Sequence, residues 1–583
     1  MVGSDTMVSV RNSGGPVLLG GYAAKQCPVR TQIDFHPLID KVAREWTPEE
    51  LARFDSGNAF EAAVFERLRA LRPDAVLIDP DARHGEAVAA TLAAMEAGKP
   101  LILGGWLPHD EAGGRTGKPD ILVRFGDGYL PADVKNHKTL QKAKRKTGLV
   151  SSLQTPADRI ALEGWSANTA HRFNDGIQLA HYTRMLQACG HHGGPMLAAV
   201  LGTSQLALES GQEPDWLLLW HDLDEPLYDT FSRSEARKKR SLLERYDHEH
   251  AFRIEVARTA LRITGGPDDP KPLVVPIGQD ECERCPYDQW CESQMAPDDP
   301  SRAITKGRLD TREYLALRRL GVDTTAALAA VDVDDPEFFD RYFAEVSNQS
   351  RNQARKKLVT LVRRAKMLDD GILLAPLGNG PIEVPSADIE IDFDIENDVD
   401  NRVYMWGVRV RRGTDDTTAR YLTDFIVWEP LDSEAEHDLA LRFTKWLRAQ
   451  RDYAAAAGQT IAVFHWAEHE ISRLKGILGL AEVGDLIHPK TGVFVDLRKV
   501  FEANFFSLRG SPLKNVAPIF GFEWEVEDPG GSVSQIYLAT VHNGDPVAAE
   551  KAKRWLLSYN KDDTAATAAV RDGMRGWPVP AAE

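Results

Sequence analysis

The chain has 583 residues, more than one ordinary hydrophobic core accommodates, so we expect two or three domains. An apolar fraction of 43% and a charged fraction of 27% are those of a folded globular protein and exclude a disordered chain. The net charge of −17 excludes binding to nucleic acid over the whole surface, but it allows a local basic patch. The sequence contains neither the roughly 18 consecutive apolar residues of a membrane helix nor a secretory signal in its opening segment, MVGSDTMVSVRNSGG. We therefore expect a cytoplasmic protein without a membrane partner.

The first predicted element is an amphipathic helix that opens with GNAFE, residues Gly57–Glu61. It offers the carboxylate of Glu61 as a metal ligand, provided that further acids lie nearby. Such acids occur in the next predicted element.

That element is a hairpin over Gly117–Lys138, with the sequence GKPDILVRFGDGYLPADVKNHK. Two strand-like runs flank a Gly-Asp-Gly turn signal, so residues whose numbers sum to about 254 should face each other. Asp120 then lies opposite Val134, within one register step of Asp133. Lys135 shares a face with Asp133 through the two-residue period of a strand.

The hairpin therefore collects two carboxylates and one ammonium at one point. Hydrolysis of a phosphodiester needs this set: hard oxygen ligands for Mg²⁺ or Mn²⁺, and a cation that positions water. The alternative is a pair of surface acids and a lysine without a common role, because a D…DxK pattern often arises by chance. Pro131 removes one ladder donor from the second strand, so we expect a bulge or an edge position there.

Three basic stretches stand out of the acidic background. Lys135–Lys146 begins at the candidate lysine, and we expect a loop that brings phosphate-binding charge beside the site. For Arg233–Arg240 and Arg351–Lys366, a solvated helix face is the simpler interpretation.

Downstream, Gln178 and Tyr182 lie four residues apart on one helical face. The order of acid, D…DxK and QxxxY resembles the RecB-type PD-(D/E)xK nucleases, which implies an α/β, restriction-endonuclease-like core. Many members carry a histidine before the first acid, where this chain has Phe60. The resemblance implies Glu61, Asp120 and Asp133 as metal ligands and Lys135 as the lysine that orients water. It also implies Gln178 and Tyr182 as substrate contacts.

Five cysteines are too few for a disulfide scaffold in a chain of this length. Cys282, Cys285 and Cys291 lie within ten residues, and three thiolates at this spacing indicate a metal site. The residues leave Cys27 and Cys189 open as the fourth ligand. A small buried apolar side chain is the simpler interpretation of Cys189.

With Cys27 as the fourth ligand, the pattern resembles RecB-family nucleases that hold a 4Fe–4S cluster. In those proteins one cysteine precedes the nuclease motifs and three follow them. The resemblance implies an iron–sulfur staple that closes a long loop around the catalytic core, and a structural zinc site is the alternative.

Turn-rich stretches on both sides of the cysteine cluster predict a domain edge near residue 300. Thr311–Val331 follows as two apolar-periodic helices broken at Gly321. Such a pair can grip a nucleic-acid backbone, although packing between domains is the simpler role. We therefore expect a nuclease domain over 1–300, a helical connector over 301–380 and a further domain over 381–583.

Beyond about residue 381 the pattern changes to strands. Asp388–Glu396 alternates strictly, and its acids fall on one face, where they repel each other unless solvent or metal relieves them. Further strands are predicted over Val403–Arg411, Ala419–Trp428 and Thr460–His465, with a helix over Ser433–Ala449. Strands followed by alternating helix and strand indicate an α/β arrangement on a mixed sheet.

More acids follow at Glu470, at the end of FHWAEHE, at Asp496, and at Asp563, four residues after Tyr559. This order resembles DnaQ-like, or DEDD, exonucleases on the RNase H fold. The resemblance implies that Asp563 joins the acids of the first strand as a metal ligand and that Tyr559 orients water.

The resemblance selects Asp394 and Glu396 as the first-strand ligands, although the alternation fits Asp392 and Asp394 as well. Glu470 stands where the family usually has an aspartate, and His469 where it has an aromatic residue. The alternative is an RNase H-like fold kept only for binding or scaffolding.

Together these features resemble a bacterial family of predicted RecB nucleases joined to a DnaQ/RNase H-like domain. The resemblance implies a nuclease dependent on Mg²⁺ or Mn²⁺ that cuts DNA, single-stranded or at ends, in repair or recombination. One alternative is a non-catalytic nucleic-acid-binding accessory of a helicase. That helicase would be another chain, because no phosphate-loop motif occurs here. Another alternative is an RNase H-like exonuclease acting on RNA through the C-terminal domain.

Overall fold

The computed structural model describes residues 15–208, 211–232, 236–346, 349–399, 401–526 and 531–578. The opening segment and the start of the basic run Arg233–Arg240 lie outside these residues. Two compact units emerge: Met1–Pro297 with Phe343–Ala354, and Asp298–Tyr342 with Arg355–Glu583. None of the helices in the described part of the chain has the length and apolar character needed to cross a membrane.

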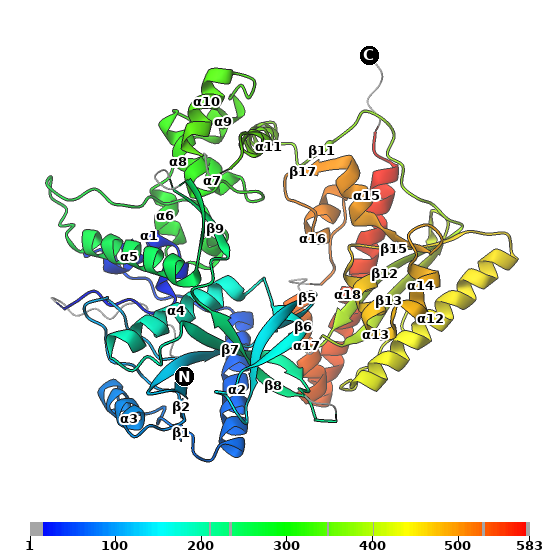
Figure 1. Cartoon of the computed structure of the whole chain (residues 1–583). Coiled ribbons are helices and arrows are strands. Elements are labelled where there is room, and N and C mark those ends of the chain that lie inside the picture. Colours follow the sequence, from blue (N-terminus) through cyan, green and yellow to red (C-terminus); the bar gives the residue numbers. More distant parts are fainter. Residues whose placement is uncertain are drawn as a thin grey trace. The chain divides into compact units, whose positions relative to one another are not determined.

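The first unit is built on a mixed eight-stranded sheet in the order β1-β2-β3-β4-β7-β8-β5-β6 (Figure 1). Two neighbouring pairs, β1 with β2 and β4 with β7, are parallel, and the other pairs are antiparallel. The strands are β1 (Val76–Leu77), β2 (Leu101–Leu103), β3 (Ile121–Phe125), β4 (Gly128–Val134), β5 (Leu140–Ser152), β6 (Ile160–Ala167), β7 (Leu197–Leu206) and β8 (Asp215–Asp222).

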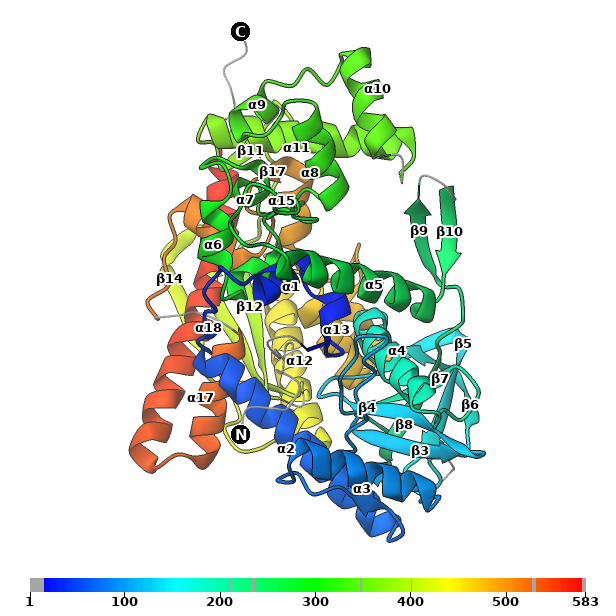
Figure 2. The ribbon, with the colours of Figure 1, turned by 90° about the vertical axis from the view of Figure 1, so that its left-hand side faces the viewer.

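Helices cover both faces of this sheet. Val64 and Leu68 of α2 pack on one face, while α3 and α4 pack on the other, where Tyr182 and Met185 meet Tyr129 of β4. A separate two-stranded ribbon, β9–β10, precedes α5 (Figure 2). The remaining elements of this unit are α1 (Pro28–Phe35), α2 (Pro48–Leu71), α3 (His84–Glu96), α4 (Arg172–Ala188), β9 (Tyr228–Ser232), β10 (Ala236–Arg240), α5 (Leu242–Leu261) and α6 (Asp288–Ser293), with short 3-10 turns at Ala23–Lys25 and Asp280–Arg284.

The predicted hairpin is present as β3–β4, one register step from the prediction. Ile121 pairs with Ala132, so Asp120 comes opposite Asp133 rather than Val134. The predicted bulge or edge position at Pro131 is wrong, because the β3–β4 ladder runs without a register shift and β4 lies inside the sheet. The ladder to β7 begins at Ala132, just after the proline.

Two further local expectations differ from the structure. Helix α2 begins at Pro48, well before Gly57, because Thr47 and Glu50 form a reciprocal capping box. The basic run after Lys135 is a strand rather than a loop from Leu140 onward, since β5 pairs with both β6 and β8. Its basic residues 144–146 lie in an exposed irregularity of the β5–β6 ladder.

The second unit holds a mixed five-stranded sheet in the order β14-β13-β12-β15-β16 (Figure 1). The ladders β12–β13 and β13–β14 are antiparallel, while β12–β15 and β15–β16 are parallel. The strands are β12 (Ile389–Asn397), β13 (Val403–Arg412), β14 (Asp415–Leu422), β15 (Ile461–His465) and β16 (Phe494–Asp496), and β11 (Leu374–Pro376) pairs separately with β17 (Phe505–Ser507).

The alternation predicted for β12 is observed and has a clear physical origin. Ile391 and Phe393 point into a core closed by Phe443 and Leu447 of α12. The acidic positions point to the opposite face, which α18 covers. The predicted third strand is shorter than expected, because β14 ends at Leu422 and only Ile426 bridges back to β13.

The helices of this unit fall into two groups. The stretch predicted to hold two helices broken at Gly321 does so, and this glycine has the positive φ of 80° that a chain reversal favours. These first helices are α7 (Pro300–Ala303), α8 (Thr311–Arg319), α9 (Thr325–Ala329), α10 (Pro336–Glu345) and α11 (Arg351–Asp369), of which α10 and α11 span both units. The helices around the sheet are α12 (Ser433–Ala456), α13 (His469–Leu478), α14 (Leu480–Ile487), α15 (Leu497–Asn504), α16 (Leu513–Val516), α17 (Gly531–Asn543) and α18 (Pro546–Arg575), with a 3-10 turn at Ala517–Phe520.

Candidate functional site

The acids in the first half of β12 are buried and paired with arginines. Arg411 of β13 and Arg575 of α18 approach the carboxylate of Glu390 to 2.7 and 2.6 Å. Arg409 lies 3.1 Å from Asp392. Arg571 of α18 forms ion pairs with both acids. The expectation that solvent or metal relieves all acids on this face is therefore wrong for these two, because arginines relieve them.

The arginines decide how these two carboxyl groups ionise. Burial alone would raise the pKa of Glu390, but Arg575, Arg571 and Arg411 outweigh it and lower that pKa. For Asp392, burial prevails and the pKa is raised, although Arg571 and Arg409 oppose it. Both side chains are completely inaccessible to solvent, so this end of the strand is a closed ionic core.

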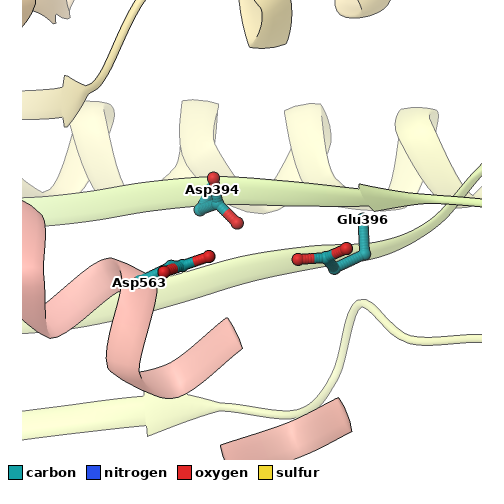
Figure 3. A group of neighbouring side chains, drawn as sticks. All are labelled: Asp394, Glu396 and Asp563. Carbon is teal, nitrogen blue, oxygen red and sulfur yellow. The ribbon is translucent and has the colours of Figure 1, made fainter. Parts of the chain in front are cut away.

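The second half of β12 carries a different arrangement. Carboxylate oxygens of Asp394, Glu396 and Asp563 lie within 4.8 Å of one another. Figure 3 shows the three carboxylates directed into the same space, two from β12 and one from α18. No other group of three or more His, Cys, Asp or Glu side chains among the described residues satisfies this spacing. Three hard oxygen donors so close together can hold Mg²⁺ or Mn²⁺.

Crowding of negative charge shows in the proton affinities. Burial, together with the charges of Asp563 and Glu396, raises the pKa of Asp394 well above its usual range. Burial and Asp563 raise the pKa of Glu396 to about 8. Burial also raises the pKa of Asp563, against the opposing charge of Lys514. A divalent cation among these oxygens would remove the mutual repulsion.

Neutral donors orient the three carboxylates. Asn560 donates to Asp394 over 2.8 Å and accepts from the hydroxyl of Tyr421. Ser534 donates to Glu396 over 3.0 Å, and the indole of Trp524 donates to Asp563 over 2.7 Å. These donors fix the side chains without neutralising them, which is suited to metal ligands.

The site predicted from the sequence did not include Asn560, Ser534, Trp524 or Lys514. Asn560 follows Tyr559 directly and could have been included with that motif. The other three lie on segments whose approach to β12 has no local signal in the sequence.

Glu470 and Tyr559 stand beside this group. Glu470 of α13 is buried and lies 3.5 Å from Nδ1 of His465. It does not belong to the three-carboxylate group, although its charge contributes to the raised pKa of Asp394. The Tyr559 hydroxyl hydrogen-bonds to Asp563 and accepts from Lys514 over 2.8 Å.

In the first unit, the structure brings most of the predicted hairpin residues together. Asp133 is buried, with Lys135 Nζ 2.5 Å from its carboxylate as an ion pair. Neither carboxylate oxygen of Asp133 accepts a hydrogen bond in the described part of the chain. Lys135 also donates to Gln178 over 3.1 Å, and the amide of Gln178 donates to the hydroxyl of Tyr182 over 3.0 Å. Asp120 accepts from the backbone of β4, at Val134 N, over 2.7 Å.

Glu61 occupies a neighbouring position. It lies on α2 and lines a groove of about 890 Å³ with Lys118 and Gly104. Gly104 N donates to the carbonyl of Asp120, so this groove adjoins the hairpin. The oxygens of Glu61, Asp120 and Asp133 do not form a group within 4.8 Å of one another.

Two basic or aromatic neighbours of the hairpin come from the start of the chain. Tyr22 OH lies 3.5 Å from Lys135 Nζ, and Lys25 Nζ lies 3.3 Å from the carbonyl oxygen of the Gln178 side chain. Neither residue belonged to the predicted site, because both precede every recognisable motif.

Four of the five cysteines gather at one place. Cys27, Cys282, Cys285 and Cys291 line a cavity of about 20 Å³ beside Tyr287. Among the described residues, no three cysteine sulfur atoms lie within 4.8 Å of one another. Burial raises the pKa of Cys27 to about 11 and that of Cys291 to about 12, with further contributions from neighbouring acids and thiols. Cys189 lies elsewhere, packed against the apolar cluster around Met185.

Residues 391–575, from β12 to the end of α18, match the family model of the RNase H superfamily. Comparisons with curated proteins and with solved structures found no match for the chain. The second unit therefore contains an RNase H-like domain, and the three-carboxylate group lies within it. This combination indicates a nuclease-type function in the processing of nucleic acid.

Proposed function

We propose that this protein is a metal-dependent nuclease whose RNase H-like domain hydrolyses phosphodiester bonds at Asp394, Glu396 and Asp563. The observation that carries this proposal is the convergence of three carboxylates from two elements within 4.8 Å. Carboxylates at this spacing repel each other and do not stabilise the fold, whereas a divalent cation needs several carboxylate oxygens close together.

Each residue has a chemical role in this proposal. The three carboxylates would hold Mg²⁺ or Mn²⁺, which polarises the scissile phosphate and lowers the pKa of water. Tyr559 donates its hydroxyl hydrogen to Asp563, and its oxygen, which accepts from Lys514, would use its remaining lone pair to orient water. Asn560, Ser534 and Trp524 hold the ligands in place.

The test is cleavage of end-labelled single-stranded DNA and RNA with Mn²⁺ by the wild type and by Asp394→Asn and Asp563→Asn. We expect each variant to lose about a hundredfold or more of the cleavage catalysed at this site, since metal stabilisation of the transition state is worth several kcal/mol. Asp496→Asn is the matched control, because Asp496 caps α15 outside the group and asparagine caps equally well. Undiminished cleavage in both ligand variants would exclude this site.

A second centre is proposed in the first unit, where Asp120 and Asp133 would bind metal and Lys135 would orient water. The supporting observation is Asp133, a buried carboxylate that forms an ion pair with the partly buried Lys135. Gln178 and Tyr182 would contact the substrate, and Glu61 would have to approach on metal binding. Together with the resemblance to RecB-type nucleases, this arrangement supports DNA, single-stranded or at ends, as the substrate, and repair or recombination as the setting.

The two centres are separable by experiment. Lys135→Ala and Asp133→Asn should abolish only the cleavage that survives Asp563→Asn. If either variant leaves that residual cleavage intact, the first unit has no catalytic role. Binding of a helicase by a chain without any intrinsic cleavage would instead favour an accessory protein.

We also propose that Cys27, Cys282, Cys285 and Cys291 hold a 4Fe–4S cluster as a staple. The proposal is supported by four thiols that line one cavity and by the resemblance to RecB-family nucleases that hold such a cluster. The cluster would join the start of this unit to its end and has no part in hydrolysis. Anaerobic purification followed by iron and sulfide analysis tests this, and stoichiometric zinc without iron would refute it.

A further inference from the structure

Lys514 is a basic side chain at the three-carboxylate group that no sequence motif includes. It lies on the short helix α16, partly buried, with its Nζ 2.8 Å from the Tyr559 hydroxyl. The same ammonium lies over the Tyr559 ring, 4.7 Å from the centroid. It is also near enough to Asp563 and Glu396 to oppose, by its charge, the effect of burial on both carboxyl groups.

Counting charges limits how many metal ions this group can hold. Asp394, Glu396 and Asp563 supply three negative charges when ionised, and Lys514 supplies one positive charge. Before substrate binds, a single divalent cation neutralises the remaining charge of these four side chains, whereas a second would leave an excess of positive charge beside Lys514 in a largely buried space. The fourth candidate acid, Glu470, stands outside the group beside His465.

We propose that the RNase H-like site binds one divalent cation and that Lys514 takes the place that a second cation has in two-metal nucleases. This inference rests on the proposed function of the site. In two-metal sites the paired ions stabilise the attacking and the leaving oxygen. Here the ammonium is the second positive centre, and it contacts a phosphate oxygen of the substrate as a point charge.

The hydrogen-bond chain gives Lys514 a second effect on the reaction. The ammonium donates to Tyr559, and Tyr559 donates to Asp563, so the direction of the hydroxyl hydrogen is determined. An ammonium has three donors, and one lysine can therefore serve more than one acceptor. Lys514 thus orients Tyr559 and contributes charge at the same time.

The experiment is Mn²⁺ binding, followed by the paramagnetic resonance signal of free Mn²⁺, in the full chain carrying Asp133→Asn. That background change removes Asp133, the buried one of the candidate metal ligands in the first unit. We expect one Mn²⁺ per chain, lost in Asp563→Asn. Lys514→Met should bind the first Mn²⁺ about tenfold more tightly or take up a second, while cleavage falls about a hundredfold. Lys514→Arg keeps the charge and should retain single occupancy.

Two Mn²⁺ in the background protein, or unchanged binding and cleavage in Lys514→Met, would overturn the role of the lysine. If Mn²⁺ binding instead survives Asp563→Asn, the metal site and the proposed function fail, and the lysine inference fails with them. Thermal unfolding of each variant separates these outcomes from loss of the fold. A purely structural lysine would change the unfolding temperature without changing the Mn²⁺ stoichiometry.

Discussion

The two halves of β12 carry the same kind of side chain on the same face and have opposite electrostatics. Glu390 and Asp392 are closed in by arginines from β13 and α18. Asp394 and Glu396 face another acid, Asp563, and are oriented by neutral donors. The difference teaches that an acidic strand face is not itself a metal site. The partners supplied by a distant helix decide which acids stabilise the fold and which are left for a cation.

Helix α18 makes this division because it runs antiparallel to β12. From Asp563 to Arg575 the helix rises about 18 Å. From Glu390 to Glu396 the strand rises about 20 Å. One end of the helix therefore brings arginines to the first acids, while the other brings Asp563 to the last.

The largest expected effect comes from removing an arginine from the first half of β12, where Glu390 and Asp392 form ion pairs. Arg571→Met should lower the free energy of unfolding by about 3–5 kcal/mol, because it removes a buried cation from Asp392 and Glu390. Urea denaturation of the second unit measures this. Arg554→Met on the exposed side of α18 is the control, with an expected change within about 0.5 kcal/mol. A small loss in Arg571→Met would mean that the two halves do not differ as described.

The second half of β12, which carries Asp394 and Glu396, should make the free energy of unfolding of the metal-free protein depend on pH. The pKa of Glu396 is raised in the folded state to about 8, above the ordinary value of 4.5, so the folded protein binds more protons between these values. The contribution of Glu396 to the free energy of unfolding is then fully present below pH 4.5. This contribution, about 2–4 kcal/mol, is lost as the pH rises through 8. Denaturation in chelator at pH 5, 7 and 9 measures this slope. Glu396→Gln should flatten it, and an unchanged slope in that variant would contradict the assignment.

A divalent cation should reverse this penalty. At 100 times its dissociation constant, Mn²⁺ should stabilise the second unit by about 2.7 kcal/mol. At a fixed Mn²⁺ concentration the gain should be larger at pH 8 than at pH 5, because protonated carboxyl groups bind metal poorly and the apparent dissociation constant is higher at pH 5. Asp563→Asn should show no gain, and thermal unfolding with and without Mn²⁺ is the measurement. Equal stabilisation of this variant would place the bound ion elsewhere.

The smallest effect concerns the first unit. Asp133 has one lysine as its ionic partner, so its charge pairing is intermediate between that of Asp392 and that of Asp394. Tyr182→Phe removes the acceptor of the Gln178 amide and should cost about 1 kcal/mol of stability. Because Gln178 also holds Lys135, the cleavage assigned to this centre should fall several-fold. Denaturation and residual cleavage in the Asp563→Asn background measure the two quantities. Stability lost without any change in cleavage would make the Gln178–Tyr182 pair purely structural.

Much of the local structure could be predicted because it depends on short-range periods. The turn signal located β3 and β4, and the spacing of Gln178 and Tyr182 placed them on one face of α4. The register of the hairpin was missed by one residue, since a turn signal does not specify which turn forms. The start of α2 was missed because its capping box lies upstream of the motif that was recognised.

The sequence by itself determined which side chains share a face: the period of two along β12 and the four-residue spacing of Tyr559 and Asp563. Only the tertiary structure decided that Arg571 meets Asp392, 179 residues away, and that Lys514 meets Tyr559. The physical reason is that ionic partners depend on how α16 and α18 pack against the sheet. That packing is set by the apolar contacts of the whole unit and leaves no spacing signal in the chain.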